Sequence, residues 1–224
     1  MQLRNSSGKR IQPGEAEAKS SYNTPVLQRD PKSHKGQNGR VVIIGGSHRF
    51  HGAPIFSALA AEASGVDLIF PVVHRCHEVE TRSASLSFIV HTFKGNSLTA
   101  SDAESILALL EHVDTCVIGP GMAETPESLE AISRIVFGAH AALVLDATAL
   151  HPRMLGSISK EQTVVLTPHR GELGRLVEKD VGNLPTKEVH ALVELLARDH
   201  GVFVLLKGPE DIVVSPNGTK KIIR

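Results

Sequence analysis

Residues that could bind an anionic ligand follow five short apolar runs of this 224-residue sequence. They are Gly45-Gly46-Ser47, Gly119-Pro120-Gly121, Asp146, Thr167-Pro168-His169 and Lys207-Gly208. Glycines let backbone amides approach a ligand closely, a lysine neutralises a phosphate group, and helix N-termini favour anions. Any one of these turns could be structural, and Asp146 could simply cap the next helix. Taken together, the five predict a site for a phosphorylated, nucleotide-like small molecule.

The known phosphate-binding motifs do not account for this pattern. Gly45-Gly46-Ser47 is not followed by the glycine and Lys-Ser/Thr of a P-loop, and no G-x-G-x-x-G fingerprint occurs. A different binding geometry is therefore expected.

Other constellations are weaker candidates for chemistry. One cluster, which could hold a metal ion, contains His74, Cys76, His77, Glu78 and Glu80. With twelve histidines in the chain such clusters are expected, so we interpret it as a solvated helix start and predict no metal ligands. No G-x-S-x-G elbow is present, and Cys116 lies within an apolar run, which favours packing over catalysis.

The apolar runs are typical of strands buried on both faces of a sheet. They cover residues 40–44, 67–73, 87–90, 114–118, 142–146, 163–167 and 202–206. Helical patterns alternate with them, which predicts βα units, a mostly parallel sheet and helices on both faces. Ligands of such sheets bind beyond the carboxyl ends of the strands, where the five turns lie. The segment from Asp211 to Lys221 and beyond, with Pro216-Asn217-Gly218 in its middle, predicts a terminal hairpin.

Three helices have start or stop signals. Ser101 and Glu104 have the spacing of a capping box, and Thr125-Pro126 is typical of an N-cap followed by a first-turn proline. Thr186 is expected to cap a third helix, which Gly201 ends.

Composition sets limits on the function. Lysine plus arginine balance aspartate plus glutamate at 24 each, so neither a nucleic-acid partner nor a membrane surface is expected. There is no long apolar stretch and no secretory h-region, and the two cysteines form no disulfide framework, so the protein is expected in the cytoplasm. Residues 1–38 are polar and predict a loosely ordered arm, with a single domain over 39–224.

Ordered motifs over some 180 residues resemble the ADP/ATP-dependent (S)-NAD(P)H-hydrate dehydratases of the ribokinase-like superfamily. The motifs are SHKG (33–36), Gly39-Arg40, GGSHRFHGAP (45–54), IGPGM (118–122), LDATAL (145–150), LTPHRGEL (166–173) and LLKGPEDIVVS (205–215). The resemblance implies a three-layer α/β/α sandwich. It also implies an enzyme that phosphorylates the hydroxyl of hydrated NADH or NADPH from ADP or ATP and then expels phosphate, with Mg²⁺ bound to the nucleotide. Because the superfamily often assembles, a homo-oligomer is a further expectation.

The resemblance also assigns roles to residues by position. It implies that the dinucleotide hydrate contacts Ala53, Gly121, His169 and Glu172, and that Gly45 and Gly46 open room for it. It implies that the phosphate-donor nucleotide borders Lys207, Gly208, Pro209, Glu210 and Asp211.

The sequence departs from the family pattern in three places. Thr148 stands where the family usually has a second Asp, and Phe50 replaces a tyrosine. The family's G-G-T-G-D motif, which carries the catalytic Asp and an anion hole, would lie beyond Arg224. The sandwich is therefore expected to be incomplete at its C-terminus and the turnover of this chain to be small. Asp146 is a conceivable substitute base, and no catalytic residue is assigned.

Two other functions stay open on the sequence. One is a ribokinase-like kinase acting on a vitamin or sugar hydroxyl. The other is a non-catalytic, nucleotide-binding remnant. Protection from thermal unfolding by the hydrate, but not by vitamin alcohols, would separate the dehydratase from the kinase.

Overall fold

The computed structural model describes residues 30–223, and a compact unit begins at His34. The first part of the predicted arm, residues 1–29, lies outside the described residues, so the arm stays a prediction. Within the compact unit, Asp67 accepts hydrogen bonds from the backbone amides of Gly36 and Asn38 at 2.8 and 3.0 Å. These bonds attach the segment before the first strand to the sheet.

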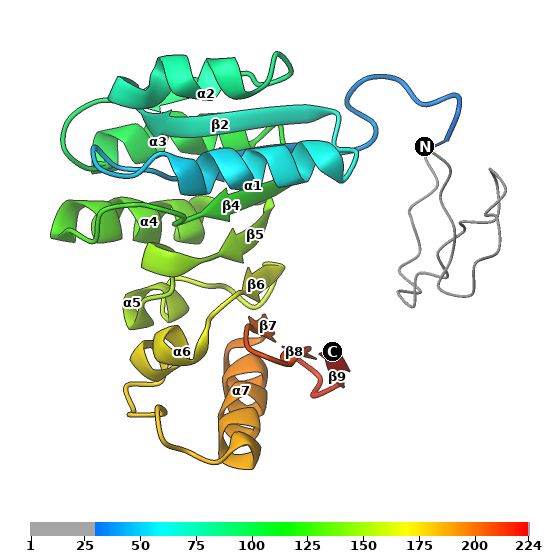
Figure 1. Cartoon of the computed structure of the whole chain (residues 1–224), viewed down its shortest axis with the longest axis vertical. Helices are drawn as coiled ribbons and strands as arrows, with labels where there is room; N and C mark the ends of the chain where they lie inside the picture. Colours follow the sequence, from blue (N-terminus) through cyan, green and yellow to red (C-terminus); the bar gives the residue numbers. More distant parts are fainter. Residues whose placement is uncertain (1–29, 224) are drawn as a thin grey trace, which may run out of the picture. The chain divides into compact units, whose positions relative to one another are not determined.

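A single mixed sheet organises the described residues (Figure 1). Its strands lie in the order β3-β2-β1-β4-β5-β6-β7-β8-β9. Neighbours from β3 to β7 pair in parallel, whereas β7-β8 and β8-β9 pair antiparallel, as the predicted hairpin requires. Their bounds are β1 Arg40–Ile44, β2 Leu68–His74, β3 His91–Phe93, β4 Thr115–Ile118, β5 Ala142–Leu145, β6 Val164–Leu166, β7 Phe203–Leu206, β8 Asp211–Val214 and β9 Lys220–Ile223.

Helices connect the parallel strands, as the alternating pattern predicts. The α-helices are α1 Gly52–Ala63, α2 Glu78–Ala84, α3 Ala100–Leu110, α4 Pro126–Gly138, α5 Pro152–Leu155, α6 Arg170–Leu176 and α7 Thr186–His200. Two short 3-10 helices occupy Arg75–His77 and Ala147–Ala149. None of the helices in residues 30–223 has the length and apolar character needed to cross a membrane.

Two apolar cores lie on opposite faces of the sheet. Because side chains alternate along a strand, Val42 and Ile44 of β1 join the core with α3, α4, α6 and α7, whereas Val41 and Ile43 join the core with α1. The second core also takes in Ala84 of α2. Helices on both faces give the three-layer α/β/α sandwich that the sequence predicts.

Only part of the sheet is buried on both faces. Every residue of β1 from Val41 to Ile44 is buried, but β5 and β7 alternate buried with half-buried or exposed positions. Val144 and Leu205 are half-buried on the face that α1 and α2 cover at β1 and β2. The expectation of strands buried on both faces therefore holds for β1 and most of β2, and not for β4 to β7.

The apolar run 87–90 does not form a strand. Phe88 and Val90 are buried in the second core, but the amide of Phe88 closes a turn to the carbonyl of Ser85. The segment makes one isolated bridge to β2, between Ile69 and Phe88. Strand β3 begins at His91 instead, so burial rather than strand pairing explains this run.

Two helix starts differ from the sequence patterns. Helix α3 begins after Thr99, whose amide donates to the carboxylate of Asp102 at 2.9 Å, so Ser101 and Glu104 do not form the capping box. Helix α7 already includes Thr186, because the amides of Glu188 and Val189 donate to the carbonyl of Pro185. The cap at Thr125 and the left-handed Gly201 at the end of α7 are as predicted.

Candidate functional site

The loops after five neighbouring strands form a continuous rim at the carboxyl edge of the sheet. The rim consists of residues 45–53, 119–122, 146–149, 167–172 and 207–211, which follow β1, β4, β5, β6 and β7. Backbone hydrogen bonds join each loop to its neighbour: Gly119 N to Ile44 O, Asp146 N to Ile118 O, Thr167 N to Leu145 O, and Lys207 N to Pro168 O, at 2.8–3.1 Å. All five turns identified in the sequence therefore lie side by side.

The end of the rim between β1 and β4 lies at a topological switch point. From β1 the chain runs outward to β2 and β3 and then returns to the other side of β1 as β4. Such a reversal is where open α/β sheets form a ligand crevice. Ala53 and Gly121 meet there, because a Cβ atom on Gly121 would lie 3.4 Å from the Cβ of Ala53.

Gly45 and Gly119 lie where neighbouring loops pack so closely that no side chain fits. A Cβ atom on Gly45 would lie 2.4 Å from the carbonyl oxygen of Pro120, and one on Gly119 would lie 1.9 Å from that of Asp146. Gly119 also has φ +116°, in the region that favours glycine. The space beside Gly45 is therefore filled by the neighbouring loop, and not left for a ligand as the sequence suggested.

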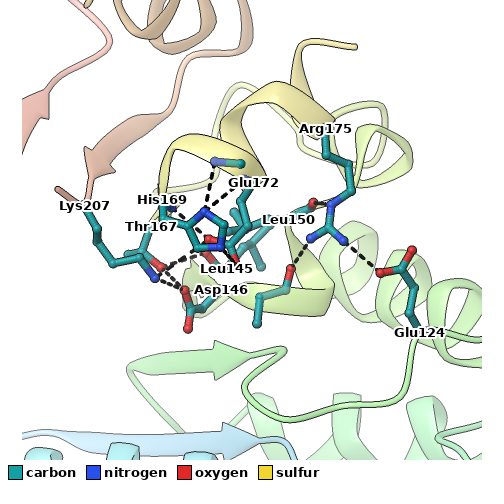
Figure 2. A network of polar contacts seen from close by, with 11 residues as sticks. Glu124, Leu145, Asp146, Leu150, Thr167, His169, Glu172, Arg175 and Lys207 are labelled. Atoms are coloured by element: carbon teal, nitrogen blue, oxygen red, sulfur yellow. Dashed lines mark hydrogen bonds and ion pairs between the residues drawn. The ribbon is translucent and has the colours of Figure 1, made fainter. Parts of the chain in front are cut away.

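The side chain of Lys207, which follows β7, lies near two carboxylates (Figure 2). They belong to Asp146, which follows β5, and Glu172, in the helix after β6. Its Nζ lies 2.8 Å from Oδ1 of Asp146 and 3.9 Å from Oε2 of Glu172. The hydroxyl of Thr167 donates to the same oxygen of Asp146 at 2.8 Å. The Glu172 side chain is 14% exposed, whereas that of Lys207 is 40% exposed, so Lys207 is the more accessible of the two at the rim.

His169 is the N-cap of α6 as well as a predicted ligand contact. Its Nδ1 accepts hydrogen bonds from the amides of Gly171 and Glu172 at 3.0 and 3.3 Å, and its own amide donates to Oε2 of Glu172 at 2.8 Å. Because Nδ1 accepts, Nε2 is the nitrogen that carries the proton in the neutral ring. The side chain is 60% exposed and can present this Nε2–H to a ligand.

Arg175 holds the loop after β5 in place. It donates to the carbonyls of Ala147 and Leu150 at 2.8 and 2.9 Å and pairs with Glu124 at 2.8 Å (Figure 2). Ala147 has φ +48°, a strained value for a non-glycine residue, directly after Asp146. No sequence pattern indicates this role of Arg175, because its partners lie 25 or more residues away.

A cavity of about 360 Å³ opens between these groups. It is lined by Ala147, Thr148, His169, Gly171, Glu172 and Arg175. The hydroxyl of Thr148 donates to the carbonyl of Met122 at 2.9 Å, so this residue, which departs from the family pattern, ties the loop after β5 to the loop after β4. The cavity therefore lies at the rim, between the loop after β5 and the start of α6.

The residues 207–211 form the turn between β7 and β8. The amide of Gly208 donates to Oδ1 of Asp211 at 3.0 Å, and Gly208, Pro209 and Glu210 are exposed. The predicted nucleotide contacts are thus gathered in one turn, next to His169, whose backbone forms a bridge with that of Lys207. Ala53 and Gly121 lie farther along the rim, toward β1.

The cluster around His74, interpreted from the sequence as a solvated helix start, lies beyond the rim, after β2. That interpretation is wrong for His74, which ends β2 and is 7% exposed. Among residues 30–223, no group of three or more His, Cys, Asp or Glu side chains could hold a metal ion. Asp146 and Glu172 are the rim carboxylates that lie on either side of Lys207, and Glu210 and Asp211 follow it in the turn before β8.

Comparison with known proteins gives a consistent result. A family model described as NAD(P)H-hydrate dehydratase matches residues 41–224. An ADP-dependent (S)-NAD(P)H-hydrate dehydratase of Cenarchaeum symbiosum is 38% identical over 200 residues, which cover 87% of this chain and 67% of the relative. An ATP-dependent (S)-NAD(P)H-hydrate dehydratase of Emericella nidulans is 30% identical, covering 89% of this chain and 60% of the relative. The chain thus spans about two thirds of the length of these relatives.

Solved structures share the fold. A ribokinase-like superfamily protein of Enterococcus faecalis superposes with a TM-score of 0.74 at 22% identity, covering 88% of this chain and 66% of the other. An ADP/ATP-dependent NAD(P)H-hydrate dehydratase of Bacillus subtilis, co-crystallised with ATP and Mg²⁺, also gives 0.74, at 24% identity, covering 88% of this chain and 67% of the other. The fold is therefore ribokinase-like, and the extent of the family match places the chain in the NAD(P)H-hydrate dehydratase family.

Proposed function

We propose that this protein removes water from the hydrated form of NADH or NADPH, with ADP or ATP as the phosphate donor. The observation that carries the proposal is the continuous rim, in which Lys207, Asp146, Glu172 and His169 lie together at one end and Ala53 and Gly121 at the switch point. Family membership supplies the reaction, since relatives named for both ADP and ATP dependence match most of the chain.

The reaction has two steps that balance in atoms and charge. First, the hydroxyl oxygen of the hydrate forms a bond to the terminal phosphorus of the donor, the donor's P–O bond breaks, and the hydroxyl proton is released. Then the C–O bond breaks, phosphate leaves, and a proton leaves the adjacent ring carbon to restore the double bond. Positioning and charge neutralisation dominate catalysis of phosphoryl transfer, and Lys207 is placed to supply that charge.

The dinucleotide and the donor occupy neighbouring parts of the rim in this proposal. The hydrate lies over Ala53, Gly121, His169 and Glu172, and the donor's phosphates lie against the turn from Lys207 to Asp211. The Nε2–H of His169, which lies 3.6 Å from Oε1 of Glu172 in a side chain that is 60% exposed, is the proposed hydrogen-bond donor for the hydrate. The adjacency of His169 and Lys207 supports this division, because the hydroxyl group must meet the donor phosphate.

Asp146 and Glu172 fit the needs of a magnesium–nucleotide complex. Mg²⁺ is usually held in such sites by one or two carboxylates together with substrate phosphates. Both side chains flank Lys207 at the end of the rim where the donor is proposed to bind. When bound, the ion would neutralise phosphate charge, while Lys207 and the carboxylates orient the donor.

Two measurements on the whole chain test the proposal. Thermal unfolding is followed with NADPH hydrate, NADPH, or a vitamin alcohol, each with and without ADP and Mg²⁺. Recovery of reduced nicotinamide from the hydrate is followed by absorbance, with AMP in place of ADP as the control. We expect the hydrate to raise the melting temperature more than NADPH does, and recovery to require ADP or ATP.

The outcomes separate the alternatives. Stabilisation by a vitamin alcohol and none by the hydrate would replace the dehydratase with a small-molecule kinase. Stabilisation by the hydrate with no recovery of reduced nicotinamide would contradict the catalytic part of the proposal and leave a nucleotide-binding protein.

A further inference from the structure

A second cavity, of about 560 Å³, lies at the carboxyl ends of β2 and β3. His48 contributes from the loop after β1, His74, Arg75 and Cys76 from the end of β2 and the 3-10 helix, and Lys94 and Asn96 from the loop after β3. The carboxyl ends of parallel strands share one edge, so this cavity continues the rim on the side away from Lys207.

The groups that line this cavity favour an anion. Arg75 and Lys94 are both exposed cations, and no carboxylate is among the lining residues. The acidic group that follows in the sequence, Glu78, is paired with Arg82 at 2.9 Å. Two cations, the imidazole of His48 and the amide of Asn96, with no carboxylate in the lining, are a typical environment for a phosphate group.

Hydrogen bonds of His74 and His77 fix the arrangement of this cavity. His74 is 7% exposed; its Nε2 contacts the carbonyl of Gly95, and its Nδ1 accepts the amide of Cys76 at 3.2 Å. The ring therefore holds the loop with Lys94 against the segment with Arg75. His77 Nε2 contacts the carbonyls of Ser47 and His48 at 3.1 and 3.2 Å, which attaches the same segment to the rim.

The position of the cavity indicates which part of the ligand reaches it. The hydroxyl that receives phosphate must lie near the donor, at the β6–β7 end of the rim. The rest of the dinucleotide then extends over Ala53 and Gly121 toward β2. From β6 to β2 there are four strand spacings in the sheet order, or about 19 Å. This distance suits an extended dinucleotide, whose far end is the adenosine.

We infer that Arg75 and Lys94 bind the phosphate on the adenosine ribose of NADPH hydrate, so that this cavity favours NADPH hydrate over NADH hydrate. The inference rests on the proposed function, which fixes the direction of the dinucleotide. The phosphate is the chemical difference between the two hydrates, and the cavity offers its charge complement at the adenosine end.

Cys76 provides a local readout of this cavity. Cys76 is an exposed residue that lines the cavity, with its Sγ 2.9 Å from Nδ1 of His74, whereas Cys116 is buried within β4, where desolvation raises the pKa of its thiol. Iodoacetamide should therefore alkylate Cys76 alone, as intact mass will show. We expect adenosine 2′,5′-bisphosphate and NADP⁺ to slow this alkylation at concentrations at which AMP and NAD⁺ do not.

Charge-removing variants complete the test. Arg75→Gln and Lys94→Gln should each weaken protection by NADP⁺ about tenfold, the effect of losing one charge-assisted hydrogen bond. Arg198→Gln on α7 and Lys160→Gln in the loop before β6 are the matched controls, because both side chains are exposed and lie away from the carboxyl edge. The controls should leave protection unchanged.

The outcomes distinguish this inference from the proposed function. Equal protection of Cys76 by NAD⁺ and NADP⁺, or none by either while the hydrate still raises the melting temperature, would overturn the inference alone. Protection by adenosine 2′,5′-bisphosphate in a chain that binds neither hydrate would support the phosphate site and overturn the proposed function. If a variant fails to fold, the comparison of ligands on the unmodified chain decides.

Discussion

The Nζ of Lys207 lies 2.8 Å from Oδ1 of Asp146, although 61 residues separate the two in the sequence. The pair spans the ends of β7 and β5, with Thr167 of the intervening loop bound to the same carboxylate oxygen. A phosphate that approaches Lys207 must therefore compete with a carboxylate already in place. This competition makes the Asp146–Lys207 pair a sensitive point for testing nucleotide binding.

Lys207→Gln should weaken binding of ADP with Mg²⁺ by roughly tenfold to a hundredfold, the range for losing a charge-assisted hydrogen bond. Lys207→Arg keeps the charge and should recover part of the affinity. Calorimetric titration of the nucleotide measures both, and Lys160→Gln serves as the control because Lys160 lies in the loop before β6. Unchanged affinity in Lys207→Gln would remove Lys207 from the nucleotide site.

His169 can be tested separately as a helix cap and as a ligand contact. His169→Ala should lower the free energy of unfolding by about 1 kcal/mol, because the amides of Gly171 and Glu172 lose their acceptor. His169→Asn should recover that stability, since asparagine is a good cap. If the imidazole contacts the hydrate, affinity for the hydrate stays low in both variants. If His169→Asn instead restores affinity for the hydrate, His169 acts only as the helix cap and does not contact the hydrate.

Gly119→Ala should be strongly destabilising. The new Cβ would lie 1.9 Å from the carbonyl of Asp146 at a φ of +116°, so strain and overpacking together should lower the free energy of unfolding by about 3–5 kcal/mol. Gly201→Ala measures the cost of a positive φ without overpacking, because φ of Gly201 is +68° and no atom lies within 4 Å of the added Cβ. Denaturant unfolding should show a loss of about 1 kcal/mol there. Equal losses in the two variants would contradict the packing described for Gly119.

The ion pair between Arg40 and Asp114 predicts a pH dependence of stability. Arg40 donates to Asp114 from its side chain and its backbone amide, and this holds the pKa of the Asp114 carboxyl below its usual value. A carboxyl group whose pKa is lower in the folded state stabilises the fold at pH values above its unfolded-state pKa. This stabilisation is lost as the pH falls through the folded-state pKa. Asp114→Asn should therefore melt below the unmodified chain at neutral pH and approach it below about pH 4.

The magnitude of this effect should be small. Both side chains are more than a third exposed, so solvent screens the pair and the difference in melting temperature should be at most roughly 2–4 °C. Asp199→Asn, an exposed position on α7, is the control in the same thermal scans. A difference that grows as the pH is lowered would have the wrong sign for this ion pair.

The sequence predicts much of the fold because strand and helix patterns are local. The strand ranges around β1, β2, β4, β5, β6 and β7, the terminal hairpin and the Thr125 cap are confirmed. The prediction of a strand at 87–90 is wrong. Phe88 and Val90 are buried without forming a strand ladder, and a buried loop has the same apolar pattern as a buried strand. The sequence also does not predict that Val144 and Leu205 are only half-buried, because it does not show which face of the sheet each helix covers.

The candidate site is predictable in its location but not in its contacts. A glycine, an aspartate, a histidine and a lysine after successive strands point to one edge of a parallel sheet. Nothing in their spacing indicates that Asp146 binds Lys207, that Arg175 holds the carbonyl of Ala147, or that Lys94 and Arg75 line one cavity. These contacts depend on strand order, and strand order arises from packing between segments far apart in the sequence.

The rim collects residues from position 45 to position 211, and its two ends become neighbours only through the strands between them. During synthesis the loop after β1 leaves the ribosome early, but it has no complete partner surface until the turn after β7 has followed it. Ligand capture by the nascent polypeptide must therefore wait until nearly the whole sheet has emerged and assembled.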